Sequence, residues 1–547
     1  MNFSDELKNY LVIRFNQIDS TDFLFAFIKD NFENLKSFYS TNNFKPVIFS
    51  DLKSIYIVDS LLAFFEKSNE HGINPEVYNI KVIKNELKKI TEPNKSLNEK
   101  YSHIINSEIL IANSLINYST HLRQGFVDPT KLFSPNYVLP HRILSDKDKM
   151  EVLSTKNKVA FLDSIQPKSE RYVRLQNALK RYESIANVNW ETISLTKNKI
   201  EPGDFFPQIK NVYKRLVLLG FIDTTKFQKL TSNKYEKFLV EPVKSFQKSH
   251  GLIPDGVIGK TTIERLNITP QEYVKKIKLN LERFRWYDYT DSSKYILVNI
   301  PDFNLRIIEG KKEVSAIKVC VGRKINWQTP ILYGQLSHLV LNPTWSVPQS
   351  IVQEEILSGL KKDSLYLKKR NFRAYKNGKR VDLSEINVKE LKTKKIRLIQ
   401  DPGAGNALGK IKFMFDNSFG VYLHDTPTRA PFNYTNRAVS HGCVRVENPY
   451  LLAEFLLKNN SEWTIDYVKL ETGQQLDDKN ILAEFQKVRN KLRKNFSYGK
   501  TTEVYLNNHI NLFIDYFTVW VDENGILNYR EDVYNKDIVL EKSLPIW

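Results

Sequence analysis

Cysteine is almost absent from this chain, which has only two, Cys320 and Cys443, among 547 residues. Two cysteines cannot supply a framework of disulfides, so the domains must be stable through buried apolar cores. Cys320 lies in the apolar run 316–321 and is expected to be a buried packing residue. Cys443 has polar and glycine neighbours, which makes it the candidate for thiol chemistry.

Long apolar runs are absent as well. No stretch of 18 apolar residues occurs, so the sequence predicts no transmembrane segment. The first ten residues, MNFSDELKNY, lack the basic stretch followed by an apolar stretch that marks an export signal. Either a leader has been removed or export takes another route, and both alternatives stay open at this point.

Acidic residues are outnumbered, since 81 lysines and arginines stand against 62 aspartates and glutamates, a net charge of +19. This balance favours polyanionic partners such as nucleic acid, an acidic membrane face or a carboxylate-rich cell wall. The basic residues are scattered along lysine-rich helices and form neither a compact patch nor a nucleic-acid motif. We therefore interpret them as a solvated surface and expect no nucleic-acid partner.

The nine histidines show no metal-ligand spacing such as H-E-x-x-H, so the sequence predicts no metal and no other cofactor. Apolar residues make up 41% and aromatic residues 12% of the chain, which is typical of a globular protein. A chain of 547 residues is long enough for roughly three to four domains. The oligomeric state cannot be predicted from these features.

Residues 421–446, VYLHDTPTRAPFNYTNRAVSHGCVRV, contain one of the two cysteines and two of the nine histidines. A short β-type run ends at His424, and a loop rich in proline, threonine and asparagine follows it. The chain then reaches Ser440-His441-Gly442-Cys443, after which residues 444–446 alternate like a strand. Asn448-Pro449 is a typical helix start. The predicted order is strand, loop, thiol, strand, helix.

Cys443 is the predicted nucleophile. A thiol attacks as the thiolate, and an imidazole within hydrogen-bond reach lowers the thiol pKa and takes its proton. His424 and His441 are both candidates for that base. An isolated cysteine is more often a buried small hydrophobe, but Gly442 before it and Arg445 after it are poorly suited to an apolar core.

The strings SHGCVRV and YLHDTP, with His424 nineteen positions before Cys443, closely resemble the signature of L,D-transpeptidase catalytic domains. These YkuD-type cysteine enzymes remodel peptidoglycan. The match is specific, because a histidine, a spaced loop and an S-H-G-C-x-R string must coincide. Four further segments resemble the large YcbB-like members of the family: NIPDFNL, QTP at 328–330, NPTWSVP at 342–348 and NALGKIKFMF at 406–415.

The resemblance implies that His424 is the general base and that a backbone carbonyl near Asp425 orients its ring. His441 is closer to Cys443 in sequence, but large members of the family can carry serine there, so a supporting hydrogen-bond role is implied for it. The expected pair of Cys443 and His424 has a thiol of low pKa. Carbapenem-type inhibitors are expected to acylate Cys443 by the same resemblance.

An oxyanion site and a carboxylate site complete the expected machinery. The backbone N–H groups of Gly442 and Cys443, with the Tyr422 hydroxyl, are suited to stabilising an oxyanion. Arg445 carries a permanent positive charge suited to a substrate carboxylate. A structural ion pair is the alternative for Arg445, and packing alone is the alternative for Tyr422.

Four regions are expected along the chain. Residues 1–200 have helical periodicity and resemble a scaffold domain, with helices predicted over 108–118 and 171–186. Residues 203–268 predict three small helices and, through VKSFQKSHGLIPDGVIGKTTIERL, resemble a peptidoglycan-binding module. Residues 280–470 predict a mostly β catalytic domain, in which about 348–400 form a helical capping insertion. Residues 471–547 are expected to complete that domain or pack on it.

The sequence therefore predicts a multidomain α+β protein with a cysteine L,D-transpeptidase activity in cell wall biogenesis and cell shape. By resemblance, Cys443 forms a thioester with the third residue of a peptidoglycan tetrapeptide stem, releases D-alanine and passes the acyl group to a stem amine. Alternatives are an L,D-carboxypeptidase, an enzyme that anchors proteins to peptidoglycan, or a wall-binding scaffold. The expected location is periplasmic or facing the cell wall.

Overall fold

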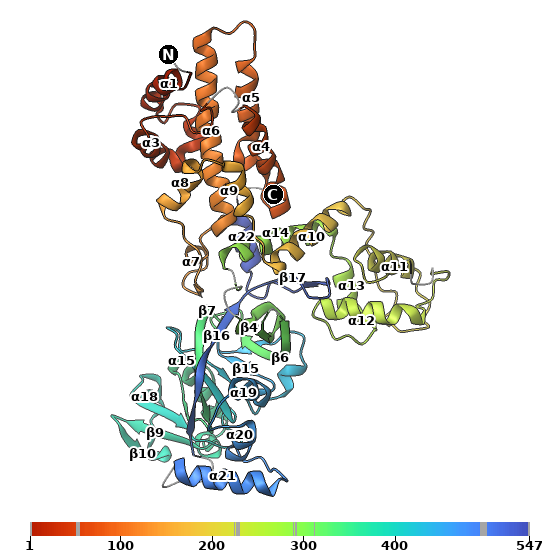
Figure 1. The fold of residues 1–547 in the computed structure, drawn as a ribbon. Helices are drawn as coiled ribbons and strands as arrows, with labels where there is room; N and C mark the ends of the chain where they lie inside the picture. The colour runs from red at the N-terminus through yellow and green to blue at the C-terminus, as the bar shows by residue number, and fades with distance from the viewer. Residues whose placement is uncertain are drawn as a thin grey trace. The chain divides into compact units, whose positions relative to one another are not determined.

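The computed structural model describes residues 3–50, 55–223, 225, 230–287, 289, 293–310, 312–492 and 500–544 (Figure 1). The chain divides into two compact units. The first comprises residues 1–133, 140–290 and 518–547, and the second comprises 134–139 and 291–517. The fold class expected from the sequence is confirmed, since the first unit is mainly helical and the second contains the large sheet.

The first unit contains two groups of helices with separate apolar cores. The longest helix, α6, begins at a capping box in which Ser96 and Glu99 satisfy each other's backbone N–H groups. It runs well beyond the predicted 108–118, because its buried face continues in both directions. The helices are α1 (Phe3–Gln17), α2 (Phe25–Ile28), α3 (Phe32–Thr41), α4 (Ile55–Glu66), α5 (Ile80–Ile90), α6 (Leu97–Gln124), α7 (Pro129–Leu132), α8 (Asp146–Ser154), α9 (Lys158–Ser164), α10 (Glu170–Ser184), α11 (Ile209–Leu218), α12 (Val240–Ser249), α13 (Lys260–Leu266), α14 (Pro270–Trp286) and α22 (Lys536–Ser543).

Three helices expected in the region 203–268 are present as α11, α12 and α13, and Gly251 ends α12 with a φ of +70°. Their core is not separate. It also contains residues of α10 and α14 and of the hairpin formed by β17 (Val519–Val521) and β18 (Leu527–Tyr529). The first unit also contains the short pair β2 (Lys199–Ile200) and β3 (Ile258–Gly259). Removing the three helices would therefore expose apolar surface on the rest of the first unit.

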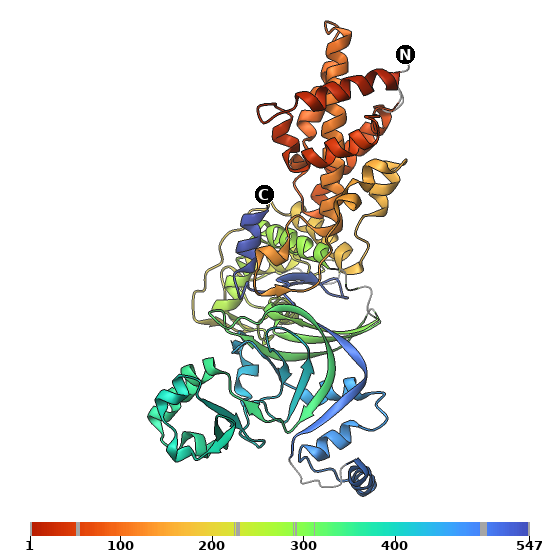
Figure 2. The same ribbon diagram turned by 90° about the vertical axis from the view of Figure 1, so that its left-hand side faces the viewer.

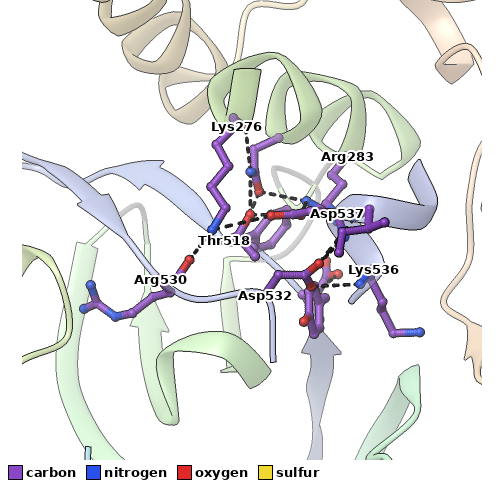
Figure 3. A network of polar contacts seen from close by, with 12 residues as sticks. Lys276, Arg283, Thr518, Arg530, Asp532, Lys536 and Asp537 are labelled. Carbon is purple, nitrogen blue, oxygen red and sulfur yellow. Dashed lines mark hydrogen bonds and ion pairs between the residues drawn. The ribbon is translucent and has the colours of Figure 1, made fainter. Parts of the chain in front are cut away.

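A buried polar network holds the end of the chain against α14 (Figure 3). Arg283 Nη1 lies 2.6 Å from Asp537 Oδ1, and Lys276 Nζ lies 3.6 Å from Asp537 Oδ2. Thr518 Oγ1 also donates to Asp537, at 3.1 Å. Burial alone would raise the pKa of Asp537, but the two cations lower it below its usual value. The carboxylate is thus charged and paired inside the first unit.

The second unit is built on a sheet that closes on itself. Its strand order is β1-β7-β12-β13-β15-β6-β5-β4-β16, and β16 pairs with β7 as well as with β4. The bounds are β1 (Tyr137–Val138), β4 (Lys294–Asn299), β5 (Asn304–Glu309), β6 (Lys312–Gly322), β7 (Ile331–Leu341), β12 (Ile411–Phe415), β13 (Leu423–His424), β14 (Ala438–Ser440), β15 (Val444–Val446) and β16 (Thr502–Asp515). The expected β-hairpins are present as β4-β5-β6, but the sheet is mixed, since β13–β15, β16–β4, β1–β7 and β14–β6 are parallel.

The insertion at about 348–400 has its own core and its own sheet, and Figure 2 shows it in teal as a distinct group of helices and strands. The helices expected over 351–360 and 388–395 are present, and the structure adds strands that the sequence analysis did not predict. The helices are α15 (Gln349–Ile351), α16 (Leu357–Lys362), α17 (Tyr366–Lys369) and α18 (Val388–Lys392), with a π-helix at Val352–Ile356; the sheet order is β10 (Lys379–Val381), β9 (Phe372–Lys376), β11 (Ile396–Gln400) and β8 (Trp345–Ser346).

Three helices follow the last strand of the thiol region. Asn448 caps α19 (Pro449–Leu457) by accepting a hydrogen bond from Leu451 N, as the Asn-Pro pair predicts. The other two are α20 (Ile465–Glu471) and α21 (Lys479–Leu492). Within the described residues, no helix is both long and apolar enough to cross a membrane.

Asp537→Ala should destabilise the first unit by about 3 kcal/mol, because it leaves Arg283 and Lys276 buried without their shared carboxylate. Urea denaturation followed by circular dichroism at 222 nm measures this, since the first unit contains most of the helices. Glu541→Ala is the matched control on the same helix. Its ion pair with Lys275 is at the surface, so a loss below about 1 kcal/mol is expected. Equal losses in the two variants would contradict a structural role for the buried network.

Candidate active site

Two neighbouring rows of side chains cross the sheet at β12, β13 and β15. In one row, Leu339, Phe413, Leu423 and Val444 pair in register and are fully buried. In the adjacent row, Lys412 pairs with His424, which pairs with Arg445. Because side chains alternate between the two faces of a sheet, the apolar row anchors the core and the polar row occupies the other face.

Cys443 and Tyr422 lie on the same face of the sheet as the polar row, one repeat earlier along their chain segments. Each lies two residues before a member of it, Cys443 before Arg445 and Tyr422 before His424. Val444 N donates to Tyr422 O at 3.1 Å, which aligns the two segments. The Tyr422 hydroxyl also hydrogen-bonds the Cys443 sulfur. The structure therefore brings together residues that are about twenty positions apart in sequence.

His424 is buried and has a defined tautomer. Its Nδ1 lies 2.5 Å from the carbonyl oxygen of Asp425, and a carbonyl can only accept, so Nδ1 carries the proton and Nε2 has a free lone pair. Burial, helped by the positive charge of Arg445, lowers the pKa of His424 to about 3. The imidazole is neutral near pH 7 and is available as a proton acceptor.

The Cys443 thiol does not have the low pKa that we expected from an imidazole partner. Burial raises the pKa of Cys443 above its usual value, although hydrogen bonds from Tyr422 and the charges of Lys412 and Arg445 oppose this. The Cys443 thiol and the His424 imidazole are therefore both neutral near pH 7. The expectation of a low thiol pKa took account of the imidazole but not of the loss of solvent around the sulfur, which raises the pKa.

The turn that carries Cys443 is held by hydrogen bonds that the sequence analysis missed. Gly442 adopts a φ of +105°, in the left-handed region that favours glycine. Thr329 Oγ1 donates to Gly442 O at 2.8 Å, and Ser440 Oγ donates to Cys443 O at 2.6 Å. Gly442 N donates to Ser440 Oγ at 3.2 Å, so this N–H already has an acceptor in the structure. The Cys443 N–H and the Tyr422 hydroxyl are the other members of the expected oxyanion site.

His441 points away from the row and toward the insertion. Its ring packs against Trp327 with centroids 4.7 Å apart, and its Nε2 lies 3.3 Å from Glu355 and 3.6 Å from Glu354. Glu354 also accepts from Trp327 Nε1 at 2.9 Å and from Arg323 at 2.8 Å. The π-helix of the insertion therefore contacts the segment before the thiol directly. Nothing in the sequence pattern indicated this contact.

Asp425 and Arg445 differ in their pairing. The Asp425 carboxylate is buried and structural, because it pairs with Arg429 at 2.5 Å and accepts from Lys410 N at 2.7 Å. Among the described residues, no carboxylate lies within 4.0 Å of the Arg445 guanidinium. The alternative of a structural ion pair for Arg445 therefore finds no partner in the described part of the second unit.

Cys320 is fully buried, as predicted, and pairs across the sheet with Arg445. Burial raises the pKa of its thiol to about 11, so it is an unreactive packing residue. The described residues contain no group of three histidine, cysteine or acidic side chains placed to hold a metal. The chemistry that the arrangement supports is nucleophilic attack by Cys443 with His424 as base.

Three segments match known protein families. Residues 293–472 match the model described as “L,D-transpeptidase catalytic domain”, and residues 33–179 match one described as “Scaffold domain”. Residues 207–266 match a model described as “Putative peptidoglycan binding domain”. A protein of Haemophilus influenzae named “Putative L,D-transpeptidase” is 32% identical over 277 residues. That match spans half of this chain and half of the relative's length.

Two solved structures show a weaker likeness. An L,D-transpeptidase fragment (residues 123–326) from Xylanimonas cellulosilytica has 16% identity and a TM-score of 0.17, covering 50% of this chain and 96% of its own. An L,D-transpeptidase from Stackebrandtia nassauensis has 14% identity and a TM-score of 0.20, covering 58% and 98%. The likeness to L,D-transpeptidases depends on the family model over residues 293–472 and on the relative at 32% identity.

Alkylation of Cys443 by iodoacetamide should rise by about tenfold per pH unit between pH 6 and 9, because only the thiolate reacts and its pKa is raised. Mass spectrometry of the Cys443 peptide measures the rate. His424→Ala should leave this profile nearly unchanged, since the neutral imidazole contributes no charge. A reactive plateau below pH 7 that disappears in His424→Ala would instead show a thiolate–imidazolium pair.

Proposed function

We propose that this chain, whose residues 293–472 are an L,D-transpeptidase catalytic domain, is a transpeptidase that uses Cys443 to form 3-3 crosslinks in peptidoglycan. The observation that supports it most directly is the placement of Cys443, Tyr422, His424 and Arg445 along one face of β13 and β15. This face combines a thiol, a neutral base and an unpaired cation. Acyl transfer from a peptide that ends in a carboxylate can use these groups as nucleophile, base and carboxylate-binding charge.

The first half-reaction forms the thioester. As sulfur attacks the carbonyl carbon of the third stem residue, a diamino acid, the thiol proton moves to His424 Nε2 and the S–C bond forms. The C–N bond to the terminal D-alanine then breaks, and the proton on His424 passes to the leaving amine. Because thiol and imidazole are both neutral at rest, proton transfer accompanies attack instead of preceding it.

Negative charge develops on the carbonyl oxygen during attack. The Cys443 N–H and the Tyr422 hydroxyl are proposed to stabilise it, and the Gly442 N–H would join them only by leaving Ser440 Oγ. Arg445 is proposed to bind the carboxylate of the stem. In the second half-reaction an amine of a neighbouring stem attacks the thioester, the N–C bond forms and the S–C bond breaks, and the proton lost by the amine passes through His424 to the sulfur, which restores the thiol.

The remaining regions are proposed to bring the reaction to the cell wall, on its periplasmic or wall-facing side. Residues 203–268 would hold peptidoglycan, as the family match at 207–266 supports, and 1–200 would act as scaffold. The insertion at 348–400 would cap the groove beside Cys443. The contacts of Glu354 with Trp327 and Arg323 support this, because they place the insertion next to the thiol turn.

The group that accepts the acyl chain distinguishes this proposal from the alternative functions. Water in place of the stem amine would make an L,D-carboxypeptidase, and a protein lysine would make an anchoring enzyme. Incubation with purified disaccharide-tetrapeptides followed by mass spectrometry tests the choice. A crosslinked dimer is expected; tripeptide alone would favour the carboxypeptidase, and no product would favour a wall-binding scaffold.

Cys443→Ala should abolish dimer formation, because the substitution removes the thiol that is proposed to carry the acyl chain. Cys320→Ala is the matched control, and it should keep activity within about twofold, since its thiol is unreactive and the change removes one buried atom. Disaccharide-tetrapeptide turnover measures both. Crosslinking by Cys443→Ala above background would refute the proposed nucleophile.

His424→Ala should slow acylation by on the order of 10²–10⁴-fold, the usual contribution of a general base. His441→Ser should keep most of the rate, because His441 faces Glu354 and Glu355 instead of the sulfur. Stopped-flow acylation by a carbapenem, an inhibitor class suggested by family resemblance, measures both, with the adduct located on Cys443. The opposite ranking would make His441 the base.

A further inference from the structure

The polar row contains a lysine that the proposed mechanism does not use. Lys412 lies on β12, in register with His424, and is half-buried. On the other side of Lys412, Val340 of β7 continues the row. Glu503 of β16 pairs with Val340, so it lies two strands from Lys412, about 10 Å away by strand spacing. Among the described residues, no carboxylate lies within 4.0 Å of the Lys412 ammonium.

The ammonium of Lys412 lies over the ring of Tyr422. Its Nζ lies 3.8 Å from the centroid of the Tyr422 ring, a cation–π contact. The hydroxyl of that same ring hydrogen-bonds the Cys443 sulfur. Lys412 and Cys443 therefore both interact with one aromatic side chain, Lys412 with its ring and Cys443 with its hydroxyl.

A half-buried ammonium without a carboxylate is unfavourable unless negative charge forms nearby. Burial lowers the pKa of Lys412, and the charge of an ionised Cys443 raises it again. The titratable and charged groups around the pair come from several elements of the second unit; they are Tyr422 and His424 at β13, His441 directly after β14, Arg445 on β15 and Glu503 on β16. Tyr422, His424 and His441 are uncharged there at neutral pH, so they cannot neutralise Lys412.

We propose that Lys412 is the fixed positive charge that stabilises the thiolate of Cys443 as its proton leaves. Its charge acts from its position against the Tyr422 ring. Lys412 is therefore a positioning residue, since it does not touch the reacting atoms. The proposal deepens the proposed function and depends on it only in taking Cys443 as the reactive thiol. It also explains how a buried thiol can ionise during attack although no imidazolium is present.

The test is the pH profile of Cys443 alkylation by iodoacetamide in the full chain with Cys320→Ala as background. Lys412→Met should raise the thiol pKa by about one unit, so that alkylation at pH 8 slows by about tenfold, as expected for the loss of a nearby opposite charge. Lys412→Arg should keep the profile close to that of the background protein. An unchanged thiol pKa in folded Lys412→Met would overturn the proposal.

Lys318→Met is the matched control. Lys318 also lies on a strand of this sheet, but its ammonium is exposed and pairs with Glu447 at 3.4 Å. Losing it removes the same unit of charge from the same domain, and the thiol pKa should stay constant. A shift equal to that of Lys412→Met would show a general effect of net charge, which would also overturn the proposal.

A second measurement does not depend on whether Lys412→Met folds. Coupling between two groups is reciprocal, so capping Cys443 with the neutral carbamidomethyl group must lower the pKa of Lys412 by a similar amount. Carbon-13 NMR of labelled lysine Cε, with Lys412 assigned by its loss in Lys412→Arg, follows this titration. No change on capping would overturn the proposal. Failure of the proposed function would look different, because disaccharide-tetrapeptides would remain unprocessed while the charge coupling persisted.

Discussion

The pairing of β13, a strand of two residues, determines the chemistry of the second unit. Leu423 is held between Phe413 and Val444 on the apolar face, and all three are fully buried. The next residue, His424, must then lie between Lys412 and Arg445 on the opposite face. A slip of β13 by one residue would exchange its two faces, which would put a polar side chain in the place of Leu423 in the core. Apolar packing therefore fixes the position of His424, the proposed base.

The site combines a rigid turn with groups that stay neutral until reaction. Thr329 and Ser440 hold the carbonyls of Gly442 and Cys443, so the thiol cannot reorient freely. Burial keeps both the thiol and the imidazole uncharged, while Arg445 keeps its charge. In the proposed mechanism the sulfur becomes negatively charged only as it attacks the substrate carbonyl. Fixed cations beside the sulfur are then worth more than they would be in water.

The helical unit is held together in a different way. Its two cores are apolar, but its last segment is attached through Asp537, Arg283 and Lys276, a buried charged cluster. The attraction between buried charges is largely offset by the free-energy cost of their desolvation. It is gained only when the charged side chains are paired in the right geometry. The three helices that match a peptidoglycan-binding model share their core with this C-terminal segment. They are therefore part of the first unit and do not form a separate domain with its own core.

Several features followed from the sequence alone. The thiol, its histidine nineteen residues earlier, the glycine at a left-handed position and the helix start at Asn448 are local, because they depend on residue chemistry and on neighbours close in the chain. Hydrophobic periodicity predicted the helical and β-rich regions for the same reason. The match to the YkuD signature was also local, since it depends on short strings.

Tertiary structure alone decided the electrostatics of the site. Lys412 occupies a polar position of an alternating strand, which in sequence is indistinguishable from an ordinary solvent-facing lysine; only strand order places it beside Tyr422. The raised pKa of Cys443 and the lowered pKa of His424 arise from burial by distant segments, which no local pattern records. The contacts of Glu354 with Trp327 and His441 likewise join residues whose proximity depends on how the insertion folds back. Local chemistry can be read from a sequence because it depends on neighbours in the chain, whereas solvation and charge depend on neighbours in space.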